Sequence, residues 1–270
     1  MNDAAAAAGG SGIDRSVPHS ARIWNYWLGG KDNYAVDREA GDAWTAVHPE
    51  IVVIARETRK LLHRSLRFLV TEAGVRQFLD VGTGLPTMDN THEMVQRLAP
   101  DSRVVYVDKD PLVLAHARAL LTGTPNGATR YLHVDMHDTQ ALTDGAAEIL
   151  DLSQPVGVYF MGVLGHVSDT GEARGIVRAL MDRMPAGSYL TIADSTHPAG
   201  QESTFARAQQ EYADSGAVPY WNRTQAEVRG FFDGLDLVEP GFVSVPLWRP
   251  DDPAVQPEPL DHFGGVARKP

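Results

Sequence analysis

The feature that most constrains this chain is a short apolar run that ends in an acid followed by two glycines. It reads Phe78-Leu-Asp-Val-Gly-Thr-Gly-Leu-Pro-Thr87, with Asp80, Gly82 and Gly84 at its end. Such a run is typical of a buried parallel strand, and the glycines let the chain turn sharply and let a ligand approach the backbone. The run therefore predicts a strand that ends at a binding site.

Two further apolar runs also end in acids. Arg103-Val-Val-Tyr-Val107 is followed by Asp108, and Thr129-Arg-Tyr-Leu-His-Val134 is followed by Asp135 and Met136. An acid after the second strand of a βαβ unit binds ribose hydroxyls. An acid after the third strand can accept a hydrogen bond from an adenine amino group, with methionine against the ring. Together these ends predict a nucleoside pocket, although acids at strand ends also cap helices.

The glycine loop indicates which nucleoside is bound. A dinucleotide loop has a third glycine, whereas this chain has Thr87 there, and the carboxylate of Asp80 would repel a pyrophosphate. The acid suits a cofactor with a cationic amino group and no phosphate, such as S-adenosylmethionine. The residues that we expect to bind the cofactor are Asp80, Gly82, Thr83, Gly84, Asp108, Lys109, Asp135, Met136 and Phe160.

Strand patterns alternate with helix patterns from residue 76 onward, which predicts an α/β fold with a parallel sheet covered on both faces. The expected strands are 76–81, 103–107, 129–134, 155–160 and 188–193, followed by short strands at 237–238, 242–245 and 262–268. The expected helices are 35–47, 50–71, 89–98, 111–121, 171–183, 202–215 and 224–232.

The chain divides into three predicted parts. Residues 1–16 are rich in alanine and glycine and form an expected disordered tail, 17–75 form a lid and helices, and 76–270 form the cofactor-binding domain. Residues 20–34 are rich in aromatic side chains but too interrupted by glycine for a long helix. They are expected to form an aromatic lid in which Tyr26, Lys31 and Asn33 approach the ligand while Trp24 and Trp27 pack.

Composition excludes several classes of protein. A net charge of −11 argues against a protein that grips nucleic acid, and the absence of cysteine excludes disulfides and thiol nucleophiles. No apolar run reaches the length of a membrane span and no signal peptide is recognisable, so we expect a cytoplasmic protein. The basic residues of the helix at 50–71 are interpreted as a solvated face rather than an anion site; they are Arg56, Arg59, Lys60, Arg64 and Arg67.

Four stretches resemble the class I S-adenosylmethionine-dependent methyltransferases, and more closely an S-adenosyl methyltransferase family whose substrates are largely unassigned. The stretches are Ala21–Tyr34, Asp80–Thr87, Val104–Pro111 and Gly187–Leu190. The resemblance implies a Rossmann-like, mostly parallel sheet of seven strands with an antiparallel finish, S-adenosylmethionine as cofactor, and methyl transfer as the reaction.

Methyl transfer needs close alignment of the two reactants, and a general base only where the acceptor carries a proton. His166, after the fourth strand, is the best base candidate, although it could instead pack on the cofactor or cap the next helix. Asp194, at the end of the fifth strand, is expected beside the substrate as a second base candidate, although it could simply cap a turn. No metal site is expected, because His133 and His137 fall at a strand end, where a spacing of four does not bring them together.

The leading hypothesis is a methyltransferase that acts on a small molecule. One alternative is a module that binds S-adenosylmethionine or S-adenosylhomocysteine without catalysis. Another is a nicotinamide-dependent oxidoreductase, which Asp80 and Thr87 disfavour.

Overall fold

The computed structural model describes residues 14–86, 89–113, 123–197, 207, 210, 213–214, 218–252 and 254–270. Within these residues the chain forms a sheet of eight strands in the order β3-β2-β1-β4-β5-β8-β6, with β7 also paired to β8. The strands are β1 (Gln77–Val81), β2 (Arg103–Asp108), β3 (Ala128–His133), β4 (Val156–Met161), β5 (Tyr189–Ser195), β6 (Asp236–Leu237), β7 (Val243–Ser244) and β8 (His262–Arg268).

Strands β1 to β5 are parallel, whereas β8 runs antiparallel to β5, and β6 and β7 run antiparallel to β8. The predicted α/β fold with a mostly parallel sheet is therefore confirmed. The sheet has eight strands among the described residues rather than seven, because the C-terminal part of the chain adds β6 and β7 as two separate short strands.

The α-helices that the structure describes are α1 (Ser20–Trp27), α2 (Ala35–Val47), α3 (Ile51–Thr71), α4 (Thr91–Leu98), α6 (Thr139–Ala147), α7 (Thr170–Arg183) and α9 (Gln225–Arg229). Short 3₁₀ turns are η1 (Leu164–His166), η2 (Gly230–Phe232) and η3 (Val245–Leu247). The helix predicted at 35–47 has the same bounds in the structure, whereas α1 and α6 were not predicted. The helices predicted at 111–121 and 202–215 lie largely outside the described residues.

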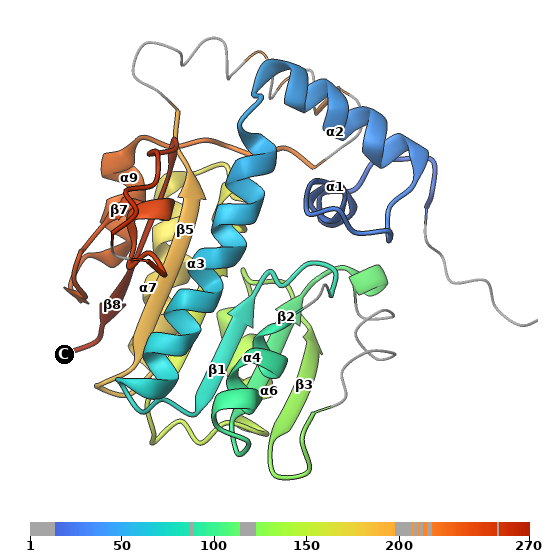
Figure 1. Cartoon of the computed structure of the whole chain (residues 1–270). Helices are drawn as coiled ribbons and strands as arrows, with labels where there is room; N and C mark the ends of the chain where they lie inside the picture. Colours follow the sequence, from blue (N-terminus) through green and yellow to red (C-terminus); the bar gives the residue numbers. More distant parts are fainter. Residues whose placement is uncertain are drawn as a thin grey trace, which may run out of the picture.

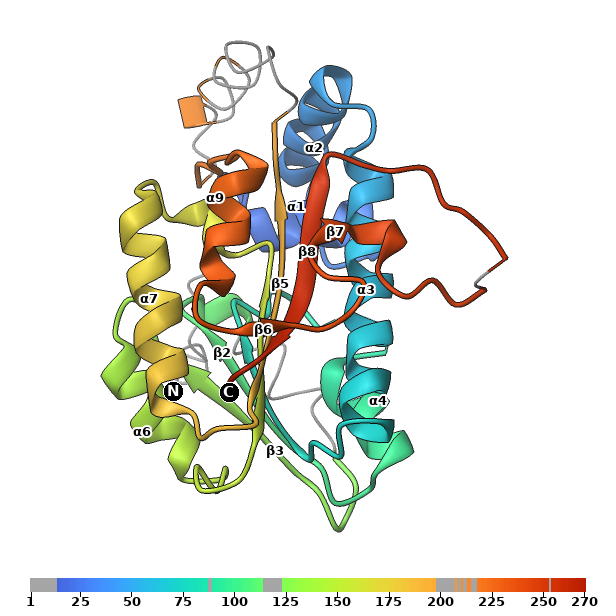
Figure 2. The same cartoon turned by 90° about the vertical axis from the view of Figure 1, so that its left-hand side faces the viewer.

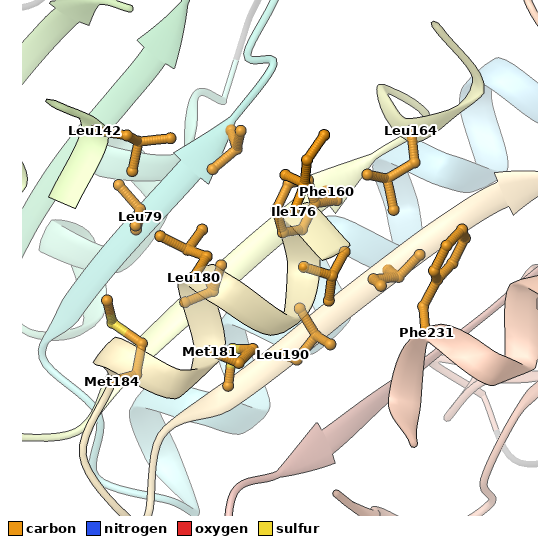
Figure 3. Close-up of a cluster of buried hydrophobic side chains, with 14 of the residues drawn as sticks. Leu79, Leu142, Phe160, Leu164, Ile176, Leu180, Met181, Met184, Leu190 and Phe231 are labelled. Carbon is orange, nitrogen blue, oxygen red and sulfur yellow. The ribbon is translucent and has the colours of Figure 1, made fainter. Parts of the chain in front are cut away.

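The helices cover both faces of the sheet (Figures 1 and 2), with α3 and α4 on one face and α6, α7 and α9 on the other. The strands contribute side chains to a hydrophobic core on each face of the sheet, because successive side chains of a strand point to opposite faces. Phe78 packs with α3, while Leu79 packs on the α7 side with Phe160 and Leu180 (Figure 3). Each of these side chains is fully buried, which stabilises the fold by about 1.5–3 kcal/mol per residue.

The N-terminal helices lie over the carboxyl ends of the sheet strands (Figure 1). Arg22 of α1 donates from Nε to Asp37 of α2, at 2.9 Å from Oδ2, and both side chains are buried. Because this pair is desolvated, removal of one partner would leave a buried charge uncompensated. Residues 1–13 of the predicted tail lie outside the described residues, but the rest of it is placed: the carbonyl oxygen of Asp14 accepts a hydrogen bond from Arg22.

None of the helices that the structure describes is both long enough and apolar enough to cross a membrane. The cytoplasmic location stays a prediction.

Candidate active site

A cavity lies at the carboxyl ends of the parallel strands, beneath α1 and beside α3. It spans the point between β1 and β4 where the strand order reverses, which is where open α/β sheets bind ligands. We name its two ends after the strands beside them. The β2 half includes Asp80, Gly82, Gly84, Asp108, Asp135 and Met136, and the β5 half includes Trp27, Trp44, His166, Ser195, Tyr220 and Asn222.

The glycine loop shapes the β2 half. Gly82 and Gly84 have φ angles of +71° and +66°, in the left-handed region that favours glycine. A Cβ atom at Gly82 would lie 2.2 Å from the side chain of Val163, so the loop is packed tightly against the residues after β4. Any side chain at Gly82 would both strain the backbone and displace this contact.

Asp108 lies at the end of β2, next to the glycine loop. Its Oδ2 accepts a hydrogen bond from the Gly84 amide at 2.9 Å, and its Oδ1 accepts one from the Asp110 amide at 3.0 Å. Burial raises the pKa of Asp108, although these two amides oppose the rise. Each carboxylate oxygen keeps a further lone pair, which can accept from a ribose hydroxyl.

Asp135 lies at the rim of the β2 half rather than deep inside it. Its Oδ2 is 3.4 Å from the Lys109 ammonium, and its Oδ1 accepts a hydrogen bond from the His137 amide at 3.0 Å. Partial burial raises the pKa of Asp135, but the hydrogen bonds from His137 outweigh it and the net pKa is lowered. Met136, Lys109 and Thr83 also line the cavity.

Asp80 and Arg59 bring opposite charges to the floor of the β2 half. Burial raises the pKa of Asp80 to about 6, while a hydrogen bond from Thr91 at 2.7 Å and the nearby guanidinium of Arg59 favour the ionised form. Arg59 comes from α3, lines the cavity, and donates to the carbonyl oxygen of Asp89 at 2.9 Å. A carboxylate and a guanidinium together complement the zwitterionic end of an amino acid.

Arg59 was missed as a site residue because the sequence interpretation assigned the basic residues of this helix to a solvated face. Its neighbours Arg56 and Lys60 are exposed, as expected, but Arg59 itself is only partly accessible. The buried positions of α3, among them Thr58 and Leu62, turn Arg59 toward the cavity.

Helix α1 spans the cavity from one half to the other. At its start, the Nε2 atom of His19 contacts a carboxylate oxygen of Asp110 beside β2, and Ala21 packs near Leu85. At its end, Trp27 packs in a cluster with Leu260, which precedes β8. The helix therefore covers both the β2 half and the β5 half.

The structure reverses the expected roles of the aromatic lid residues. Trp24 and Trp27 line the cavity, whereas Tyr26, Lys31 and Asn33 do not. The Tyr26 hydroxyl donates to Asp42 of α2 at 2.8 Å, Lys31 is exposed, and Asn33 donates to the carbonyl oxygen of Gly30 at 2.9 Å. The cause is helical geometry, because residues three or four apart on α1 share the face that meets the cavity and Tyr26 lies off that face.

His166 belongs to η1 and lines the β5 half. Its Nδ1 lies 2.9 Å from the carbonyl oxygen of Pro219, and a carbonyl oxygen can only accept, so Nδ1 carries the proton. Burial lowers the pKa of His166, which makes the neutral ring the dominant form near pH 7. In that form Nε2 has no proton and keeps a lone pair.

Asp194 and Phe160 lie outside the cavity wall, contrary to expectation. Phe160 points into the α7-side core, and the next residue, Met161, lines the cavity instead. Asp194 is fully buried at the end of β5, where it accepts a hydrogen bond from the Tyr220 hydroxyl, and burial raises its pKa to about 6. Tyr220, which has no sequence signature, occupies the wall position that was expected of Asp194.

A chain of hydrogen bonds connects Ser195 to α3. The hydroxyl of Thr58 donates to the carbonyl oxygen of Ile54 at 2.8 Å, so it must accept from His262 Nε2, which lies 2.9 Å away. The pKa of His262 is lowered to about 3 by burial, so the ring is neutral and its Nδ1 is an acceptor. Ser195 Oγ, 3.0 Å from Nδ1, therefore donates its proton to His262.

The strand order, the glycine loop and the acids after β1, β2 and β3 define a class I S-adenosylmethionine-dependent methyltransferase, and its cofactor is S-adenosylmethionine. The sequence matches the S-adenosyl methyltransferase family over residues 6–270, and the chain belongs to that family. The donor set fits this cofactor, since Asp80 and Arg59 complement its amino acid end and Asp108 its ribose.

Two solved structures are similar over nearly the whole chain. A DUF574 family protein from Streptomyces avermitilis MA-4680 is 44% identical, with a TM-score of 0.87, covering 95% of this chain and 99% of that one. A proposed methyltransferase from Thermobifida fusca YX is 38% identical, with a TM-score of 0.84, covering 95% of this chain and 96% of that one. A search of the curated proteins finds no match.

Proposed function

We propose that this methyltransferase acts on a small molecule that binds in the β5 half of the cavity, with His166 as general base. The observation that carries the proposal is the hydrogen bond from His166 Nδ1 to the carbonyl oxygen of Pro219. That bond leaves Nε2 as the ring atom able to take a proton, and the lowered pKa keeps it unprotonated near pH 7.

The β2 half is suited to hold the cofactor. Asp108 would accept from the ribose hydroxyls, Met136 would contact the adenine, Asp80 would bind the ammonium group, and Arg59 would bind the carboxylate. When bound, the cofactor supplies an electrophilic methyl group on a cationic sulfur. The glycine loop and α1 exclude water from this end of the site, which strengthens each of these charged contacts.

The bound cofactor would supply its methyl group to the acceptor atom, and its sulfur would keep the electron pair of the broken bond. The proton of the acceptor goes to Nε2 of His166, which becomes an imidazolium. Tyr220 packs edge-to-face on the His166 ring at 5.3 Å between centroids and helps to hold its orientation. Because the His166 ring is held by both Pro219 and Tyr220, it loses little conformational entropy on reaching the reactive geometry.

A small acceptor is supported by the enclosure of the β5 half. Trp27, Trp44 and Ser195 in its wall are each at most 8% exposed, whereas Val218, which also lines the cavity, is 39% exposed, so part of this end is closed to a macromolecule. The net charge of −11 also disfavours a nucleic acid as acceptor.

The test measures release of S-adenosylhomocysteine from purified protein with a panel of small phenols, amines, carboxylic acids and thiols, beside a peptide mixture and total RNA. Turnover with a small molecule and none with the macromolecules is expected. Turnover with peptide or RNA alone would refute the small acceptor. Calorimetric cofactor binding with no turnover on any acceptor would indicate a binding module instead.

The role of His166 is tested with His166→Gln, which keeps a polar side chain but removes the base. Its kcat near pH 7 is expected to fall about 10²–10⁴-fold, with unchanged affinity for S-adenosylhomocysteine. The matched control is His133→Gln, a histidine on β3 that does not line the cavity. An unchanged kcat in His166→Gln would remove the general base from the proposal.

A further inference from the structure

We infer that the acceptor is an uncharged, flat aromatic compound that carries at least two O–H or N–H groups, such as a diol on a fused ring. The inference rests on the proposed function and specifies the substrate class of the same site. It follows from three properties of the β5 half: its aromatic wall, the direction of its hydrogen bonds, and the position of its charges.

The wall that α1 and α2 contribute is aromatic. Trp24, Trp27 and Trp44 line the cavity, and the first two are packed edge-to-face with ring centroids 5.8 Å apart. Ile51 of α3 and Val163 after β4 add apolar surface. Indole and isoleucine surfaces favour a flat apolar ligand over a flexible polar one, because apolar area is removed from water on both partners.

Three polar groups at the end of the sheet present lone pairs rather than protons. His166 has its proton on Nδ1, committed to the carbonyl oxygen of Pro219. Ser195 donates its proton to His262, and Tyr220 donates its proton to the buried carboxylate of Asp194. A ligand that meets these groups must therefore supply the hydrogen.

Asn222 adds a fourth acceptor. Its Oδ1 is buried in the wall of the β5 half and has no hydrogen-bond partner among the residues that the structure describes. A buried acceptor without a partner is destabilising, and a donor on a ligand would relieve that cost. Because Asn222 lines the cavity, a second O–H or N–H beside the group that is methylated would supply the missing partner.

The charges that the described residues bring to the cavity disfavour an ionic acceptor. Among the described residues, the aspartates, Lys109 and Arg59 that line the cavity belong to the β2 half, and burial lowers the pKa of His48 and His166 at the other end. A carboxylate would bring further lone pairs to groups that already accept. An ammonium would lie beside the cationic sulfur of the cofactor without a carboxylate partner.

The experiment uses four matched probes on the full chain saturated with S-adenosylhomocysteine. They are a naphthalene diol with adjacent hydroxyls, its dimethyl ether, the matching hydroxynaphthoate and naphthylmethylammonium. Calorimetry is expected to show that the diol binds at least tenfold more tightly than each of the others. Equal or tighter binding of the ether, the carboxylate or the ammonium would overturn the inference, as would no binding of the diol.

Ser195→Ala tests the assigned direction of the hydrogen bond. It is expected to weaken diol binding about threefold to tenfold without affecting the dimethyl ether, because only the diol uses the serine lone pair. A general structural defect would weaken both probes, and the exposed Ser153→Ala is the control. Equal losses for diol and ether would overturn the role of Ser195. Binding of the diol without methylation of any small molecule would refute the proposed function but leave this binding preference standing.

Discussion

Thr91 Oγ1 lies 2.7 Å from Oδ2 of Asp80, and this hydrogen bond holds a buried carboxylate at the floor of the cofactor end of the cavity. The bond connects the start of α4 to the end of β1, so the orientation of the carboxylate is set by two rigid elements. Because burial still raises the pKa of Asp80 to about 6, its ionisation falls within the range that a binding experiment can cover.

Cofactor affinity should therefore depend on pH through Asp80. The ionised carboxylate binds the ammonium of the cofactor, so affinity is expected to be constant above pH 7 and to fall up to about tenfold per pH unit below the pKa. The measurement is calorimetry with S-adenosylhomocysteine between pH 5 and 8. Asp80→Asn should bind weakly and without this pH dependence. If the affinity of the variant still falls at acid pH, that fall is caused by another group, such as Asp108.

The same raised pKa predicts that ionisation of Asp80, which favours cofactor binding, lowers the stability of the cofactor-free protein. A carboxyl whose pKa is higher in the folded state than its ordinary 3.8 binds its proton more tightly when folded. Asp80 thus contributes stability below pH 4 that is lost as the pH rises through about 6. Asp80→Asn is expected to stabilise the cofactor-free protein at pH 8 relative to wild type, measured by urea unfolding; equal loss of stability at pH 5 and 8 would contradict this.

Asp108→Ala is expected to reduce affinity for S-adenosylhomocysteine at least tenfold. The reason is the loss of a carboxylate acceptor for the ribose hydroxyls, worth about 1.5–3 kcal/mol for a hydrogen bond to a charged group. Calorimetry checks the affinity, and the exposed Asp101→Ala is the matched control. Unchanged affinity in a folded Asp108→Ala variant would refute the ribose assignment.

Arg59→Met is expected to weaken S-adenosylhomocysteine about 10–100-fold while leaving adenosine, which has no carboxylate, unaffected. Comparing the two ligands by calorimetry separates loss of a carboxylate contact from a general change in the pocket. Arg56→Met, on the exposed side of the same helix, should change neither affinity. A parallel loss for both ligands would show that Arg59 supports the pocket rather than binding the carboxylate.

The pH–rate profile should report His166 as a base with a pKa below its ordinary 6.5. The base acts when neutral, so kcat/KM is expected to be level above pH 7 and to decline only at more acid pH. Substituting His166 by Gln should remove the decline of kcat/KM at acid pH together with most of the rate. A decline of kcat/KM at acid pH that persists in the variant would be caused by the acids of the cofactor site.

Much of the fold was predictable because it depends on local patterns. The apolar runs that end in Asp80 and Asp108 became β1 and β2, and the helix expected at 224–232 became α9 followed by η2. Helix α1 was missed because Gly29 and Gly30 suggested an interruption. The glycines in fact follow the helix, and Gly29, with φ of +79°, lets the chain leave it.

The β5 half of the site was harder to predict because distant segments meet there. Periodicity shows which side of a helix is apolar, but not which loop crosses over it. Tyr220 and Asn222 belong to a segment without a motif, and only the tertiary structure brings them beside His166 and Ser195. Asp194 was recognised as chemically notable, but the sequence could not show that a tyrosine ring separates it from the cavity.

The single helix that reaches from Asp110 to Leu260 has a consequence for turnover. Spent cofactor and methylated product would both lie under α1, so the release of either would disturb contacts that cover the other. Binding at the two ends should accordingly be cooperative, with each ligand raising the affinity of the other by the same factor.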